Sequence, residues 1–128
     1  MEIVIIPVTP FAQNCSLIWD AGSKQGAFVD PGGDIQKLIG AASDNQVTIE
    51  KIILTHGHLD HVGGTVELAK HYDVPIIGPH LGDKFWLDAL MQQSQMFGFP
   101  PATPFVPNQW LNDKDTISVG ELTLEVLH

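Results

Sequence analysis

The sequence predicts an α/β (or α+β) fold, and three observations lead to it. Short segments rich in Ile and Val alternate with a helical pattern of apolar residues, which is typical of a sheet packed against helices. Apolar residues make up 44% of the 128 residues, which is enough to form the core of one small domain. No apolar run approaches the roughly 20 residues that a membrane-spanning helix requires.

The first 30 residues predict three strands in an antiparallel arrangement. Residues 2–8 are rich in Ile and Val, and Pro7 indicates an edge position or an early end. Residues 14–20 form a second apolar segment, and residues 27–30 form a third after the turn at 21–26. Short connections of this kind favour antiparallel pairing of neighbouring strands.

A helix and a further strand follow, and they predict a crossover unit. Asp34 is placed to cap a helix whose apolar residues lie at i, i+3, i+4 and i+7 between Ile35 and Ala42. Residues 51–55 form a short apolar strand, so the strand, helix and strand together indicate a buried sheet. Further along the chain we expect helices at 65–72 and 81–95, a strand at 74–77, and a hairpin of strands 116–119 and 122–127.

The charge of the chain excludes some classes of protein. Six Lys and Arg residues stand against fifteen Asp and Glu residues, and the resulting formal charge of −9 disfavours binding to nucleic acid. A single cysteine, Cys15, rules out an internal disulfide framework. The N-terminus has no basic region or cleavage site typical of a signal peptide, so we expect a cytoplasmic protein.

The most informative segment is 55–64, which places three histidines and one aspartate within six residues. Imidazole and carboxylate groups are the ligands that zinc, iron and manganese accept. His56 and His58 are two residues apart, so an extended backbone points both side chains the same way, while Asp60 and His61 can reach a second point nearby. We therefore predict that these four residues bind metal. The glycines of this segment permit close backbone packing, among them Gly63 and Gly64.

Several other residues allow two interpretations. Asp30 and Thr55 each end a predicted strand, either as ordinary turn residues or as hydrogen-bonding partners that orient a metal-binding histidine. Cys15 is expected to be a small buried residue, and His71 and His80 are expected at the surface. One apolar group forms either ordinary core or a wall near a substrate mouth: Phe85, Trp86, Met96, Phe97 and Phe99.

The pattern His-x-His-x-Asp-His after a strand resembles the signature of the metallo-β-lactamase superfamily. Residues 29–33 (Val-Asp-Pro-Gly-Gly) are similar to an early turn of that family, and residues 13–18 and 119–128 also match it. The resemblance points to the compact glyoxalase II-like branch. It implies a four-layer αββα sandwich, in which residues 1–128 form about the N-terminal half of a metallo-β-lactamase-like domain that is incomplete at its C-terminus.

The resemblance also implies the ligand set. His56 and His58 would bind a first metal ion and Asp60 and His61 a second, with zinc expected in both sites and iron or manganese possible. Family members add a histidine from a Pro-Gly-His segment, a bridging aspartate and a last histidine. None of these three is present here, and His128 matches the residue before that segment. We therefore expect this chain alone to lack the remaining ligands.

The activity implied for the parent protein is hydrolysis of a small-molecule thioester, similar to hydroxyacylglutathione. A metal-activated hydroxide would attack the acyl carbonyl, the thiolate would leave without a strong general acid, and Asp60 would orient the water as the catalytic residue. Two alternatives from other classes stand beside it. One is an iron-dependent sulfur dioxygenase of the same superfamily, and the other is a non-catalytic fragment or interaction module that associates with another chain through an exposed sheet face.

Overall fold

A five-stranded mixed sheet forms the centre of the molecule in a computed structural model, which describes residues 1–9, 13–98, 102 and 104–127. The strand order is β1-β2-β3-β4-β5, with bounds Glu2–Val8, Gln13–Trp19, Gln25–Val29, Thr48–Ile53 and Ile76–Ile77. β1, β2 and β3 are antiparallel, whereas β3, β4 and β5 are parallel. The predicted antiparallel start and the crossover unit are both confirmed.

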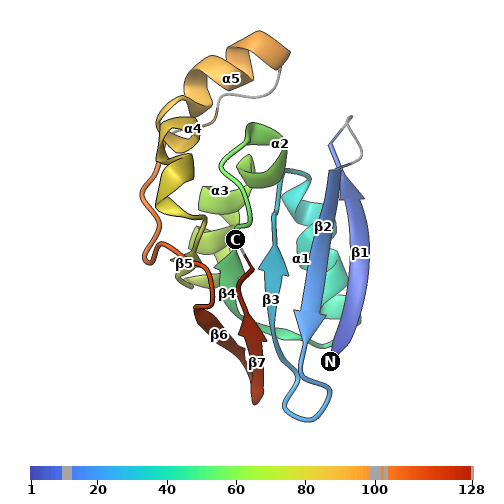
Figure 1. Ribbon diagram of the computed structural model, residues 1–128. Helices are drawn as coiled ribbons and strands as arrows, with labels where there is room; N and C mark the ends of the chain where they lie inside the picture. The colour runs from blue at the N-terminus through green and yellow to red at the C-terminus, as the bar shows by residue number, and fades with distance from the viewer. Residues whose placement is uncertain (10–12, 99–101, 103, 128) are drawn as a thin grey trace.

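Helices cover one face of this sheet, behind it in Figure 1. They are α1 (Ile35–Asp44) and α3 (Thr65–Tyr72), and α3 has the predicted bounds. Leu38 of α1 and Leu68 of α3 are fully buried against Phe28 and Ile52 of the sheet. Burial of such side chains stabilises the fold by about 1.5–3 kcal/mol each.

A two-stranded hairpin lies against the other face. β6 (Thr116–Val119) and β7 (Leu122–Glu125) pair around Gly120, as predicted, and Ile117 and Val119 pack against Ile18 and Ile53 of the large sheet. The described part of the chain thus has a helix layer and two sheet layers (Figure 1).

Two apolar side chains of β1 stay outside this packing. Ile3 and Ile5 are 53% and 51% exposed, and the alternation of the strand directs them to the face on which the hairpin lies. Association with another chain through this face stays a prediction. None of the helices described is long and apolar enough to cross a membrane.

The expected single helix at 81–95 is wrong. The chain forms a 3-10 turn, η1 (Leu81–Asp83), and then two helices, α4 (Lys84–Asp88) and α5 (Leu90–Phe97). The break is at Ala89, whose φ of −98° and ψ of 13° are not helical. The break leaves the Trp86 carbonyl to accept a hydrogen bond from Gln93 Nε2 at 2.8 Å. This hydrogen bond joins the two short helices on either side of the break, where the apolar spacing favoured one continuous helix.

Asp34 occupies the N-cap position of α1 but does not cap the helix. Its backbone is left-handed (φ 52°), and its side chain makes no capping hydrogen bond. Oδ2 instead accepts from the backbone N–H of Thr9 at 2.7 Å. The expected capping role is therefore wrong, because the carboxylate ties the end of β1 to the start of α1.

Asp20 connects the turn after β2 to the turn of the β6–β7 hairpin. Its Oδ2 accepts from the backbone N–H of Glu121 at 2.9 Å, and its Oδ1 accepts from that of Gly22 at 3.0 Å. The bond from Glu121, followed by that from Gly22, holds the pKa of Asp20 below its ordinary value. Glu50 assists by accepting from the N–H of Gly120 at 2.8 Å. The Asp20 carboxylate therefore helps to hold the β6–β7 hairpin on the five-stranded sheet.

We expect Asp20→Asn to lower the thermal unfolding midpoint at neutral pH, because an amide cannot accept all of these hydrogen bonds. Since folding lowers the pKa of Asp20, its stabilisation is complete above the unfolded pKa of about 3.9 and is lost as the pH falls through the folded pKa. The difference from the wild type should therefore shrink in acid. Circular dichroism melts across pH measure it, with the exposed Asp44→Asn as control. A pH-independent difference would contradict this assignment.

Candidate metal centre

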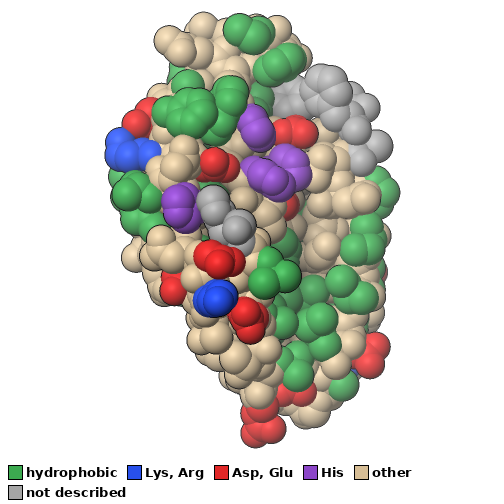
Figure 2. Space-filling model, viewed as in Figure 1, with side chains coloured by type: hydrophobic (Ala, Val, Ile, Leu, Met, Phe, Trp, Pro, Cys, Tyr) green, Lys and Arg blue, Asp and Glu red, His purple; other side chains and the backbone are tan. Residues whose placement is uncertain are grey.

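The His-rich segment lies at the carboxyl end of β4, where the chain leaves the sheet. His56 and His58 lie in the loop after β4, and Asp60 and His61 lie in the first turn of α2 (Leu59–Val62). Figure 2 shows histidine side chains gathered on one face, close to apolar side chains at the end of the molecule that carries α4 and α5. Functional groups at the end of a buried parallel strand are held by a rigid scaffold.

The structure brings three of the four predicted ligands close together. The rings of His56 and His61 have centroids 4.6 Å apart, and His61 Nε2 lies 3.9 Å from Asp60 Oδ2. His58 is further out, with its ring centroid 6.1 Å from that of His56 and 4.4 Å from that of Trp86. His58 therefore stands between the histidine cluster and the apolar side chains of α4.

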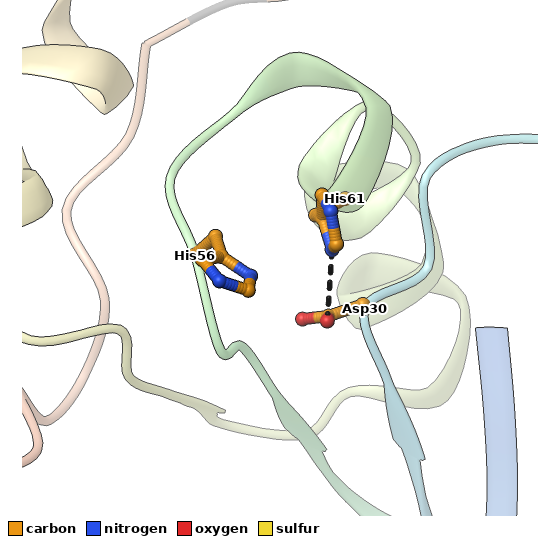
Figure 3. Close-up of side chains that lie close together, drawn as sticks. All are labelled: Asp30, His56 and His61. Carbon is orange, nitrogen blue, oxygen red and sulfur yellow. Dashed lines mark hydrogen bonds and ion pairs between the residues drawn. The ribbon is translucent and has the colours of Figure 1, made fainter. Parts of the chain in front are cut away.

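Asp30 joins this cluster from the end of β3. Ligand atoms of Asp30, His56 and His61 all lie within 4.8 Å of one another (Figure 3). The Asp30 side chain is buried and already accepts several hydrogen bonds. Its Oδ1 accepts from the Thr55 N–H at 2.7 Å, and its Oδ2 accepts from the Thr55 hydroxyl and from His61 Nδ1, the latter at 3.0 Å. Of the two roles that the sequence left open for Asp30, the geometry favours the acceptor that orients a histidine.

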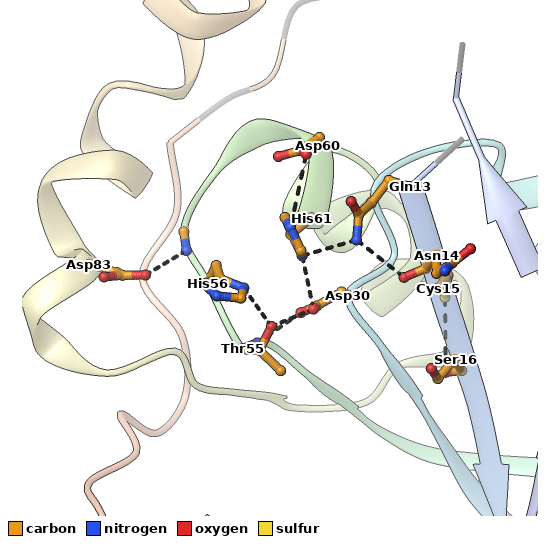
Figure 4. Close-up of polar contacts among 11 residues, drawn as sticks. Gln13, Asn14, Cys15, Ser16, Asp30, Thr55, His56, Asp60, His61 and Asp83 are labelled. Atoms are coloured by element: carbon orange, nitrogen blue, oxygen red, sulfur yellow. Dashed lines mark hydrogen bonds and ion pairs between the residues drawn. The ribbon is translucent and has the colours of Figure 1, made fainter. Parts of the chain in front are cut away.

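The hydrogen bonds to Asp30 also determine which ring nitrogens are available (Figure 4). The single proton of the Thr55 hydroxyl is donated to Asp30, so Thr55 Oγ1 accepts from His56 Nδ1 at 2.8 Å. His61 Nδ1 donates to Asp30 in the same way. In this arrangement the Nδ1 atoms are the donors, so the lone pair of Nε2 on each neutral imidazole would be left for a ligand, as metal-binding histidines require.

The electrostatics of His61 follow from the same contacts. The hydrogen bond to Asp30 raises the pKa of His61 above its ordinary value, and the charges of Asp30 and Asp60 act in the same direction. Burial opposes this shift but does not cancel it. A more basic imidazole is also a better electron donor to a metal ion.

Two glycines allow the turn after β3 to approach α2. A Cβ atom on Gly32 would collide with the backbone oxygen of Asp60, and one on Gly63 would lie 2.5 Å from the Gly32 oxygen. The N–H of Gly64 donates to the Pro31 oxygen at 2.9 Å. The predicted close approach at Gly63 and Gly64 is confirmed, and it sets the distance between Asp30 and His61.

Sequence reasoning missed two residues that hold the His-rich loop. Asp83 Oδ2 accepts from the N–H of Gly57 at 3.0 Å, and Gln93 Oε1 accepts from the N–H of Leu59 at 3.0 Å. Both lie more than 20 residues from the motif in the chain, and neither shares a recognisable pattern with it. Only the packing of η1, α4 and α5 beside the loop reveals them.

The other residues singled out in the sequence differ in their burial. Cys15 is buried, as predicted, and burial, with the Asp30 charge adding, raises its thiol pKa to about 12, so it cannot serve as a nucleophile. His71 is exposed as expected, whereas His80 is half-buried and its Nδ1 accepts from Gly82 N–H at 2.9 Å.

Of the apolar group, Trp86 and Phe97 line a cavity beside the histidines, although the Phe97 side chain is also 56% exposed. Phe85 and Met96 are exposed and do not line this cavity. Phe99 and His128 lie outside the described residues.

Residues 8–128 match the Metallo-beta-lactamase superfamily, so the chain belongs to this family. The match includes the histidine motif, the Asp30 turn and the hairpin. The resemblance and the fold class predicted from the sequence are thereby confirmed.

Curated relatives give a finer comparison. The chain is 43% identical, over its whole length, to hydroxyacylglutathione hydrolase GloC of Haemophilus influenzae, of which it covers 60%. It is 28% identical to the probable metallo-hydrolase YqgX of Bacillus subtilis, with 95% of this chain and 57% of that protein covered. The chain therefore spans about three fifths of the length of these relatives.

Solved structures agree on the fold. The crystal structure of BLEG-1, a B3 metallo-beta-lactamase, is 29% identical, with a TM-score of 0.85 over 99% of this chain and 61% of that one. The structure of TTHA1623 in a di-iron-bound form has a TM-score of 0.83 at 24% identity, over 98% of this chain and 60% of that one.

We expect Gly32→Ala to lower the free energy of unfolding by about 1–3 kcal/mol, because its Cβ must push α2 away from the Asp30 turn. Zinc affinity, measured by calorimetry, should fall with it. Gly40→Ala is the matched control, since nothing lies within 4 Å of a Cβ there, and Ala favours helix α1 by about 0.5–1 kcal/mol. Equal effects of the two substitutions would refute the close-approach argument.

We expect Asp30→Asn to weaken the binding of a divalent metal ion, with added zinc as the probe, by roughly 10–100-fold, the usual effect of removing a group that orients a metal-binding histidine. The side chain of asparagine has one acceptor oxygen and an NH₂ group that only donates, so it cannot accept all the hydrogen bonds from Thr55 and His61 that Asp30 accepts. Calorimetric titration of the metal-free protein measures the change, and Asp73→Asn at the exposed end of α3 serves as control. Unchanged affinity in Asp30→Asn would exclude an orienting role.

Proposed function

We propose that the protein is a metal-dependent hydrolase that cleaves a thioester of the hydroxyacylglutathione type, with His56, His58, Asp60 and His61 as metal ligands. One observation carries the proposal. The buried carboxylate of Asp30 and the Thr55 hydroxyl hold the imidazoles of His61 and His56 by their Nδ1 atoms, which leaves both Nε2 atoms for a ligand, and His61 Nε2 lies 3.9 Å from Asp60 Oδ2. The name of the 43% identical relative supports the substrate class.

The donor set fits a divalent metal ion. Neutral imidazole nitrogens and a carboxylate oxygen 3.9 Å from one of them are ligands that zinc accepts, and iron or manganese accept the same groups. We propose zinc in two sites, one held by His56 and His58 and the other by Asp60 and His61. When bound, such ions supply Lewis-acid polarisation of a carbonyl and lower the pKa of water from about 15.7 towards neutrality.

The side chains of this chain have distinct tasks in the proposed reaction. Asp60 carries a half-exposed carboxylate that lines the cavity, where it can accept a hydrogen bond from a water molecule and orient it towards the substrate. Asp30 and Thr55 keep His56 and His61 in the required tautomers. Cys15 is excluded as a nucleophile by its burial, so hydrolysis by water is the consistent route.

A thioester suits this arrangement better than an amide. A thiolate is a stable leaving group and needs no general acid, whereas the amine of a β-lactam must be protonated as it leaves. None of the described residues that line the cavity is Lys, Arg or Tyr, which would supply such a proton. We place the protein in the cytoplasm as part of the same proposal, since its single cysteine suits a reducing compartment.

The test uses the protein purified from its native source, with its intact mass compared with the 14.0 kDa of this chain. Metal analysis and release of free thiol from a hydroxyacylglutathione are then measured on that form. We expect metal-dependent turnover, and in Asp60→Asn a loss of roughly 100-fold or more. His71→Gln, at the exposed end of α3, should retain full activity.

Each other outcome contradicts part of the proposal. Iron-dependent oxygen consumption without thiol release would favour the sulfur dioxygenase. A protein of 14.0 kDa with neither bound metal nor turnover would favour a binding module. Full activity in Asp60→Asn would remove Asp60 from the mechanism.

A further inference from the structure

A cavity of about 400 Å³ lies between the His-rich loop and the helices α4 and α5. Its walls include His58, Asp60 and His61 on one side and the aromatic side chains of Trp86 and Phe97 on the other. The cavity therefore opens directly onto three of the four predicted metal ligands. A volume of this size is at the small end of the range for ligand-binding cavities.

The wall of the cavity that faces the predicted ligands is largely apolar. Trp86, Phe97 and Leu59 supply hydrocarbon surface, and the polar side chain there, Gln93, is 8% exposed and already bonded at both ends of its amide. Gln93 Oε1 accepts from the Leu59 N–H, and Nε2 donates to the Trp86 carbonyl. A ligand group at this wall would therefore contact apolar side chains, and the Gln93 amide is already hydrogen-bonded within the protein.

The charge around the cavity disfavours an anionic ligand group. None of the described lining residues is Lys or Arg, and Asp60 contributes a carboxylate. The whole chain carries a formal charge of −9. An acyl group ending in a carboxylate would therefore lose its hydration without gaining a cationic partner, which is costly.

The wall is held in place relative to the ligands. The Trp86 ring packs on His58 with centroids 4.4 Å apart and on Phe85 at 4.6 Å. Asp83 binds the Gly57 amide, and a Cβ on Gly57 would lie 3.0 Å from that of Trp86. Because these contacts tie α4 and α5 to the loop, the apolar wall is organised before a ligand binds.

We infer that this cavity binds the acyl part of the substrate, that it selects an uncharged acyl group with an apolar chain or ring, and that Trp86 and Phe97 determine this preference. The inference rests on the proposed thioesterase function and names the acyl class for that site. Its test is therefore a binding measurement on the metal-free protein, which does not depend on turnover.

The probes are thioesters of N-acetylcysteamine carrying acetyl, butyryl, hexanoyl or succinyl groups, titrated calorimetrically. Butyryl and succinyl chains both have four carbons, but succinyl ends in a carboxylate. We expect affinity to rise by about fourfold for each added methylene, the gain from burying one CH₂, and succinyl to bind more weakly than butyryl. Equal binding of butyryl and succinyl, or no binding of any probe, would overturn the inference.

Two variants on one helix locate the effect. Phe97→Ala removes a cavity wall near the exposed end of α5, whereas its neighbour Met96 is 77% exposed and does not line the cavity, so Met96→Ala is the matched control. We expect Phe97→Ala to weaken hexanoyl binding by roughly tenfold and acetyl binding little, and Met96→Ala to change neither. Equal losses in both variants would refute the assignment.

A third variant, Trp86→Leu, keeps an apolar wall but removes the ring, and circular dichroism verifies that each variant is folded. A weaker chain-length dependence in folded Trp86→Leu is the expected result, because Leu offers less apolar surface than the indole ring, and an unchanged dependence would remove Trp86 from the preference. Failure of the thioesterase proposal has a separate signature: the acyl preference in binding would persist while no thioester is hydrolysed in the presence of metal.

Discussion

The buried carboxylate of Asp30 is the group on which the rest of the site depends. It lies where β3 ends, and its hydrogen bonds reach Thr55 after β4 and His61 in α2. Parallel pairing brings these two strand ends to the same edge of the sheet, so the carboxylate joins three segments that are distant in sequence. A buried charge is stable only when its oxygens are bonded, and here the partners are the groups that orient the histidines.

Two glycines, together with η1 and α5, also hold the His-rich loop in position. Gly32 and Gly63 let the Asp30 turn and α2 touch, which sets the spacing between acceptor and imidazole. On the opposite side, Asp83 and Gln93 bind two backbone amides of the His-rich loop. The loop is thus held from both sides, so the predicted metal ligands would need little rearrangement on binding.

The charges and the packing around the site together limit the kinds of ligand that it can bind. The imidazoles beside Asp60 are a donor set that suits a divalent cation, while the neighbouring cavity offers aromatic surface without Lys or Arg among its described residues. The buried thiol of Cys15 takes no part. A polar rim of this kind next to an apolar wall is consistent with the proposed substrate, which has a reactive carbonyl and a hydrocarbon group attached to it.

The sequence by itself determined the fold class, the crossover unit, helix α3, the closing hairpin and the His-rich segment, because each depends on local spacing. A periodic pattern of apolar residues, a turn residue or a dense group of histidines can be recognised within a short stretch of sequence. The sequence left the role of Asp30 open. It also predicted one helix across Ala89 and a capping role for Asp34, and both predictions were wrong. Only the tertiary structure decided these points, together with the contacts of Asp83 and Gln93, because each hydrogen bond joins residues brought together by folding and not by position in the chain.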